Sequence, residues 1–280
     1  MKGVDWSDKV ASDFRTRIII EPDSPILAFK ANRDRYTRQT QPNYEGLPYL
    51  GSQDSEDALT WNVFRSLQKA SGLDIVCNEL DIGEPRGMLL WTLAPETDGV
   101  NAELQYAVGT VIRKFDGILR GQMTEPDAII LGSTGIAVIE CKLGQPDSPL
   151  SHLWEGSPDS VSKRLSIYRQ AEPNLLKNDV TEEQITEIYQ LVRMAFYVVQ
   201  FGKYLASPPV VVSLANGNNW HREIRRLRKS PAELWDFVQD AIAAPNLRKK
   251  QLTWQHLRGL IAGSSLDELS HYLSTHPCLQ

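Results

Sequence analysis

The chain has 280 residues, of which 41% are hydrophobic and 23% are charged, and its formal net charge is -5 with a sequence pI near 5.6. This length and composition support one large folded domain, or one and a half, with a sizeable core, and they exclude an intrinsically disordered chain. The acidic balance also lacks the basic excess that is typical of nucleic-acid-binding proteins.

The sequence lacks the marks of exported and zinc-binding proteins. Its first residues, MKGVDWSDKVASDF, contain no apolar core for a signal peptide, and no apolar run reaches transmembrane length. The three cysteines, Cys77, Cys141 and Cys278, show neither a disulfide framework nor metal-ligand spacing, and no HExxH motif is present. We therefore expect a soluble cytoplasmic protein with no membrane partner.

The N-terminal third contains an arm and a helix. Residues 1–50 are rich in Pro, Arg and Tyr toward their end, which predicts an extended N-terminal arm. Residues 54–70 have Leu59, Val63 and Leu67 at helical spacing, with Glu56 on the same stripe. Glu56 is either a carboxylate aimed at whatever the helix packs on or a first-turn acid favoured by the helix dipole, and both readings stay open.

Residues 125–143, EPDAIILGSTGIAVIECKL, form two apolar runs around a Gly-Ser-Thr-Gly turn. If residues 132–135 are the turn of an antiparallel hairpin, Asp127 and Glu140 face each other, with Lys142 on the same side. Carboxylates opposite each other across a ladder have Cβ atoms roughly 4.5–5.5 Å apart, and they repel unless a cation neutralises them. Hard carboxylate ligands suit Mg²⁺, so the pair predicts a divalent metal.

Further elements are expected on both sides of this hairpin. Apolar stretches at 73–80, 88–93 and 104–119 complete a set of strands before it. Residues 183–205 show helical spacing, and the run VVVSL after Pro209 reads as a buried strand. Residues 231–275 are expected to be helical, with N-terminal signals at Ser230 and a capping box from Ser265 to Glu268.

The hairpin motif resembles the PD-(D/E)XK superfamily of restriction-endonuclease-like nucleases: Pro126-Asp127, twelve residues, then Glu140-Cys141-Lys142. The resemblance covers about residues 51–216 and implies an α/β fold. Its αβββαβ core would have a mixed, mostly antiparallel central sheet flanked by helices. We accordingly expect an arm at 1–50, a nuclease-like core at 51–220 and a C-terminal helical appendage at 221–280.

The resemblance also implies a mechanism, the metal-dependent hydrolysis of phosphodiester bonds, with DNA as the expected substrate. Asp127 and Glu140 would hold Mg²⁺, for which Mn²⁺ would substitute, and the Cys141 carbonyl would be a third ligand. Lys142 would position or activate the attacking water, and Glu56 would support the metal through water or help a second ion.

Two further expectations follow from the family. Some members place a Gln near the scissile phosphate on the second helix, which makes Gln190 a candidate. An ordinary polar flank on a packed helix is the alternative for it. Restriction-type enzymes commonly dimerise to cut both strands, so a homodimer is also considered. Basic clusters at 33–38, 222–229 and 248–250 offer phosphate contacts despite the acidic balance, although solvated surface charge also explains them.

Three alternatives to a nuclease remain. The chain could keep this fold as a catalytically inert nucleic-acid-binding or assembly module. The motif could also be an ordinary hairpin whose charged residues lie at a solvated end. A retaining glycosidase would use two carboxylates about 5–5.5 Å apart, but Lys142 beside the pair fits that chemistry less well.

Overall fold

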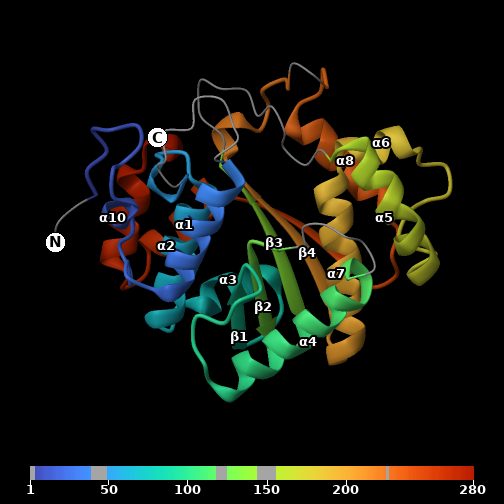
Figure 1. The fold of residues 1–280 in the computed structure, drawn as a ribbon, viewed down its shortest axis with the longest axis horizontal. Helices are drawn as coiled ribbons and strands as arrows, with labels where there is room; N and C mark the ends of the chain where they lie inside the picture. Colours follow the sequence, from blue (N-terminus) through green and yellow to red (C-terminus); the bar gives the residue numbers. More distant parts are fainter. Residues whose placement is uncertain (1–3, 39–48, 118–124, 144–155, 225–226) are drawn as a thin grey trace.

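The computed structural model describes residues 4–38, 49–117, 125–143, 156–224 and 227–280. In this part of the chain, one five-stranded sheet lies between two groups of helices, as Figure 1 shows. The predicted α/β class, with a mixed sheet flanked by helices, is therefore confirmed. The strands are β1 (Pro85–Leu90), β2 (Ala128–Gly132), β3 (Ile136–Lys142), β4 (Pro209–Ala215) and β5 (Arg248–Thr253).

The helices divide between the two faces of the sheet. One face carries α4 (Gly99–Asp116), α5 (Pro158–Ala171), α6 (Glu182–Glu187), α7 (Tyr189–Leu205) and α8 (Pro231–Ala241). The other face carries α1 (Pro25–Arg38), α2 (Glu56–Lys69), α3 (Leu73–Leu80), α9 (Trp254–Ala262) and α10 (Asp267–Thr275). Short 3-10 turns are η1 (Phe14–Arg17), η2 (Tyr49–Gly51), η3 (Gly217–Asn219) and η4 (Pro277–Leu279).

The strands lie side by side in chain order, β1-β2-β3-β4-β5. The pairs β1/β2 and β2/β3 are antiparallel, whereas β3/β4 and β4/β5 are parallel. The expectation of a mostly antiparallel sheet is therefore wrong. Parallel neighbours need a crossover connection, and the helices α5 to α7 supply it between β3 and β4, as α8 does between β4 and β5.

The β2–β3 hairpin has the register that the sequence predicts. Ala128 faces Ile139 and Leu131 faces Ile136, while the Gly132 amide donates to the Gly135 carbonyl across 2.8 Å to close the turn. A side chain at Gly132 would meet the Ile82 carbonyl oxygen at 2.0 Å, so the turn needs glycine there. This register places positions 127 and 140 opposite each other at the end of the ladder.

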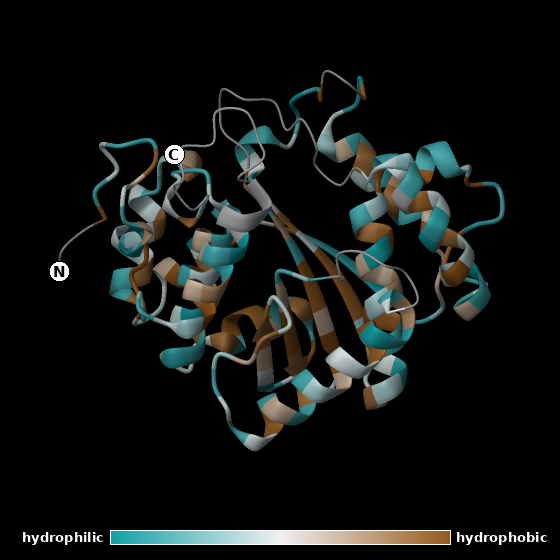
Figure 2. Ribbon diagram, in the orientation of Figure 1, coloured by the Kyte–Doolittle hydropathy of each residue, from teal (hydrophilic) through white to brown (hydrophobic). Residues whose placement is uncertain are grey.

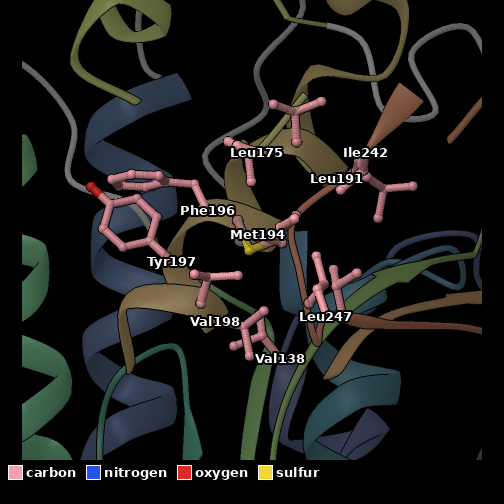
Figure 3. Close-up of a cluster of buried hydrophobic side chains, with 14 of the residues drawn as sticks. Val138, Leu175, Leu191, Met194, Phe196, Tyr197, Val198, Ile242 and Leu247 are labelled. Carbon is pink, nitrogen blue, oxygen red and sulfur yellow. The ribbon is translucent and has the colours of Figure 1, made fainter. Parts of the chain in front are cut away.

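Side chains of the hairpin alternate between two separate cores. Ile129 and Val138 pack with α4 and α7 on one face, and Ile130 and Ile139 pack with α2 and α3 on the other. The strands form the apolar centre of the molecule in Figure 2. Figure 3 shows part of the first core, in which Val138 lies at the edge of a cluster that includes side chains of α7. Burial on both faces fixes the register, because a slip by one residue would exchange the two sets.

Two of the expected strands are helices. Residues 73–80 form α3 and most of residues 104–119 form α4, so that of the three apolar stretches only 88–93 contributes a strand, β1. The buried positions explain the difference, because they recur every three or four residues rather than every two. In α3 they are Leu73, Val76, Cys77 and Leu80, and in α4 they include Leu104, Ala107, Val108, Val111 and Ile112.

The predicted N-terminal and central helical regions also differ in detail. Residues 25–38 of the expected extended arm are helical, because Leu27 and Ala31 pack against the second core. Residues 39–48 of the arm lie outside the described part. The expected helix at 183–205 is two helices, α6 and α7, which meet at the non-helical residue Ile188.

The C-terminal segment is not purely helical. Residues 248–253 form β5, which pairs with β4 and completes the sheet of the predicted core. Its sequence, RKKQLT, gives little strand signal, because Leu252 is the one buried residue of this edge strand. A capping box is present at Ser230 and Glu233, but the one predicted at Ser265 is absent, since α10 begins after Leu266 without a side-chain cap.

Among the described helices, none combines the length and the apolar character needed to cross a bilayer.

Candidate active site at the ends of β2 and β3

The hairpin brings Asp127 against the strand that carries Glu140. Asp127 precedes the first residue of β2, and its Oδ2 atom accepts a hydrogen bond of 2.7 Å from the backbone N–H of Cys141. Glu140 and Lys142 share the face of β3 that bears Val138, because side chains alternate along a strand. Cys141 lies buried on the opposite face, as predicted. The two carboxylates therefore share one end of the sheet.

Lys142 joins carboxylates from two distant segments. Its Nζ atom lies 2.8 Å from Oε1 of Glu140 and 3.5 Å from Oε2 of Glu56. Glu56 is the first residue of α2, and its Oε1 atom also accepts a hydrogen bond of 3.0 Å from the Leu143 backbone N–H. Of the two readings left open for Glu56, the structure favours the one in which this side chain reaches the hairpin.

The charged side chains of this cluster are partly or largely buried. The side chains of Glu140, Lys142 and Glu56 are 8%, 12% and 31% exposed, so the cluster is accessible mainly at Glu56. In such surroundings an unpaired charge is costly, and each carboxylate depends on a cation or on hydrogen-bond donors. The cluster is thus a partly closed site rather than a solvated hairpin end, which removes the ordinary-hairpin reading.

The pKa shifts follow from this burial. Burial raises the pKa of Asp127 well above its usual range, and the negative charge of Glu140 adds to the shift. Burial also raises the pKa of Glu56, although the charge of Lys142 opposes it. Burial alone would lower the pKa of Lys142, but the three surrounding carboxylates outweigh it and raise that pKa well above its usual range. Lys142 is therefore protonated at neutral pH.

Two charged residues beside the site were not expected from the sequence. The Nζ atom of Lys30, on α1, lies 3.1 Å from Oδ1 of Asp57 and 4.4 Å from the ring centre of Trp91. The negative charge of Asp57 contributes to the raised pKa values of Asp127 and of Glu56. Asp57 lies in the first turn of α2, next to the candidate Glu56, whereas Lys30 lay in the supposed arm and carried no signal.

The charge balance of the cluster leaves an excess of negative charge. When ionised, four carboxylates (Glu56, Asp57, Asp127 and Glu140) face two ammonium groups (Lys30 and Lys142), which leaves two negative charges uncompensated. A divalent cation would neutralise that excess. The donors are hard oxygen atoms, the type that Mg²⁺ accepts, and in this chemical sense Asp127, Glu140 and the Cys141 carbonyl fit the ion.

The side-chain positions do not form a ready-made metal cage. Within the described residues, no group of three or more His, Cys, Asp or Glu side chains is arranged to hold a metal ion. Glu140 instead contacts Lys142. Two protein carboxylates would suffice for Mg²⁺, which keeps several water ligands.

The topology places the start of α7, which carries Gln190, toward the same end of the sheet. α7 leads into β4, which runs parallel to β3, so the first turn of α7 lies toward the end of the sheet that carries Lys142. Gln190 is the second residue of α7, and Tyr189 beside it is buried in the first core. The expectation that Gln190 belongs to the site stays a prediction.

Comparison with protein-family models, with curated proteins and with solved structures found no match to this chain.

Proposed function

We propose that this protein is a Mg²⁺-dependent nuclease of the PD-(D/E)XK type that hydrolyses phosphodiester bonds in DNA. The observation that carries the proposal is the arrangement of Asp127, Glu140 and Lys142 at one end of the hairpin, with Glu56 reaching them from α2. Paired buried carboxylates beside a protonated lysine suit the chemistry of a phosphate, because the metal and the ammonium both stabilise negative charge.

The order of elements supports the same proposal. Read along the chain, α2, β1, β2, β3, α7 and β4 follow the order αβββαβ, with α3 inserted before β1, α4 between β1 and β2, and α5 and α6 before α7. The candidate residues come from the first helix and the second and third strands of that series. These are the positions at which the resemblance expects a supporting Glu and the metal-binding motif.

Each residue then has a role that its surroundings allow. Asp127 and Glu140 would hold the ion, with the Cys141 carbonyl beside them. Bound Mg²⁺ would polarise a phosphoryl oxygen and lower the pKa of a water molecule. Protonated Lys142 would donate hydrogen bonds to the attacking water or to phosphate oxygens. It is a poor proton acceptor at neutral pH because its pKa is raised.

Glu56 would support this arrangement from α2. Its two oxygen atoms contact Nζ of Lys142 and the backbone N–H of Leu143, and thereby fix the lysine and the end of β3. Among Glu56, Glu140 and Lys142, Glu56 has the most exposed side chain and is therefore the most accessible to solvent. That position suits a carboxylate that acts on the metal through water.

The test is hydrolysis of labelled linear, circular and single-stranded DNA with Mg²⁺, Mn²⁺, Ca²⁺ or EDTA. We expect cleavage with Mg²⁺ and Mn²⁺ and its loss in Asp127→Ala and Lys142→Ala, while circular dichroism shows the fold retained. Lys114→Ala, a change at an exposed residue of α4, is the matched control and should cleave normally. A Lys142→Ala protein that cleaves as fast as the unchanged one would refute the assignment.

Calorimetry separates this proposal from an inert module with the same fold. A competent site should bind Mg²⁺ in the unchanged protein and lose that binding in Asp127→Ala. A protein that binds DNA without binding the metal, and that hydrolyses none of the substrates, would support the inert nucleic-acid-binding or assembly module instead.

A further inference from the structure

A groove lies beside the candidate active site, between α4 and the turn that follows β1. Its cavity volume is about 460 Å³, within the range of sites that hold small molecules. The lining is mixed, with apolar side chains, small residues, one aromatic ring and charged groups. The lining residues are Thr92, Leu93, Ala102, Gln105, Tyr106, Gly109, Ile112, Arg113 and Glu125.

The backbone connects the groove to the site at two places. The backbone N–H of Trp91 donates to the carbonyl of Asp127 across 3.3 Å, and the next two residues, Thr92 and Leu93, form one wall of the groove. Glu125, which also lines the groove, is two residues before Asp127, so their Cα atoms are at most about 7 Å apart. α4 also covers the face of the sheet to which Asp127 belongs by strand alternation.

Small residues on α4 keep the groove open. Gly109 lies within the helix, where glycine is unfavourable, yet a side chain there would meet nothing closer than the flexible end of Arg113 at 3.7 Å. Packing therefore does not require glycine at this position. A larger side chain at 109 would project into the cavity.

The groove has the chemistry of a nucleotide site. Tyr106 is 66% exposed, although tyrosine usually buries much of its surface. Arg113 is exposed at the same wall, and the opposing charge of Glu125 is paired with Arg33. An exposed aromatic ring beside a guanidinium group is how proteins hold unpaired nucleotides, with the base stacked on the ring and the phosphate near the cation.

We propose that this groove holds an unpaired nucleotide next to the scissile phosphate, with its base on Tyr106 and a phosphate at Arg113. The proposal rests on the proposed nuclease function and names its substrate class, DNA with unpaired nucleotides beside the cut. A base paired within a duplex cannot offer its face to Tyr106, because its neighbours in the stack already cover that face.

The test is binding of a labelled single-stranded oligonucleotide and of the corresponding duplex, measured by fluorescence anisotropy in EDTA. Tyr106→Ala should weaken single-strand binding by about 5- to 150-fold, the effect of removing one stacking aromatic. Duplex binding should change less than about twofold. Tyr204→Ala is the matched control, because Tyr204 is a 51% exposed tyrosine on α7, and it should leave both affinities unchanged.

Two further variants test the groove by other means. Arg113→Gln should weaken single-strand binding and reduce its salt dependence, whereas Lys114→Gln, a change at the next exposed residue, should have a smaller effect. Gly109→Leu should fill the groove and weaken single-strand binding while strengthening the helix. Gly259→Leu is its control, because Gly259 lies on α9 with nothing within 4 Å of an added Cβ.

The outcomes separate the two proposals. If the unchanged protein cleaves DNA but the Tyr106, Arg113 and Gly109 variants bind and cut single strands normally, the groove proposal is overturned and the nuclease stands. Equal weakening of single-strand and duplex binding would also overturn it. If no metal supports cleavage while the groove variants lose single-strand binding selectively, the nuclease proposal fails and the strand-binding groove remains.

Discussion

Lys142 and Glu140 lie two positions apart on β3, on the same face of the strand, and form an ion pair of 2.8 Å. The same lysine faces Glu56, so one ammonium group is shared between carboxylates from a strand and from a helix. The charge balance at this end of the sheet therefore depends strongly on this one side chain. Several properties of the protein should depend on that balance.

Lys142→Met should weaken the fold in the absence of metal. The substitution leaves Glu140 buried without its cation, a loss on the order of 3 kcal/mol in the free energy of unfolding. Mg²⁺ should restore part of that loss, because it supplies positive charge to the same carboxylates. Urea unfolding with and without Mg²⁺ measures both effects. Lys114→Met, at an exposed site, should change stability by less than about 0.5 kcal/mol. Equal stability of the two variants would contradict the ion-pair interpretation.

Asp127→Asn should stabilise the metal-free protein at neutral pH. The pKa of Asp127 is higher in the folded state than in the unfolded chain, so Asp127 takes up a proton on folding at intermediate pH. The protein is therefore most stable with Asp127 protonated, and its free energy of unfolding falls as the pH rises through the folded-state pKa. Asparagine removes the buried charge and can still accept the Cys141 hydrogen bond. We expect the melting temperature at pH 7 to rise by about 2–4 °C for each kcal/mol gained in the free energy of unfolding. Below about pH 4 the melting temperature should not change, because Asp127 is then protonated in both the folded and the unfolded chain.

The exposed Asp236 of α8 gives the control for that experiment. Asp236→Asn removes a carboxylate of the same type from the surface, and its melting temperature should follow that of the unchanged protein across the pH range. If Asp127→Asn instead destabilises the protein at pH 7, the Asp127 charge is compensated in the folded state and the proposed repulsion with Glu140 is wrong.

Mg²⁺ binding should release protons. The carboxylate of Asp127 must be ionised to bind the metal, and its raised pKa means that a fraction remains protonated in the free site. Affinity should therefore increase with pH up to that pKa and level off above it. Calorimetric titrations in two buffers of different ionisation enthalpy measure the released protons directly. Binding heats that are identical in both buffers at mildly acidic pH would argue against Asp127 as a ligand.

Lys30→Met should affect the site from outside it. The substitution removes the partner of Asp57, whose negative charge then acts more strongly on Asp127 and raises its pKa further. We expect Mg²⁺ binding to shift to higher pH and the fold to lose about 1–3 kcal/mol. The double variant Lys30→Met/Asp57→Asn should restore the original pH dependence. A shift that persists in the double variant would show that Lys30 acts through packing on Trp91.

The register of the hairpin was predictable because it depends on residues that are close together in the sequence. The length of the Gly-rich turn sets which residues face each other, and the alternating burial of Ile129 and Ile130 locks that register. Glu56 was also visible, since it shares a stripe with the apolar side of its helix. The sequence could not show whether that stripe reached the hairpin. That question depends on how α2 crosses the end of the sheet.

Other features depend on contacts between distant segments. The pairing of Lys30 with Asp57 joins a helix that the sequence presented as an arm to the start of α2. β5 carries one buried side chain, and its strand conformation comes from hydrogen bonding to β4 rather than from its own pattern. For α4 the signal was present, since the spacing of its buried residues is helical, and the error lay in reading an apolar stretch as a strand.

The basic residues of the edge strand β5 also affect self-association of the protein. Arg248 bonds to the backbone carbonyls of Leu80 and Asp81 at the C-terminal end of α3, and Lys249 bonds to those of Gln239 and Ile242 at the C-terminal end of α8. If the edges of two β5 strands paired, these like-charged side chains would come close together. Self-association by strand addition at β5 is thereby opposed, which protects the sheet from growing into aggregates.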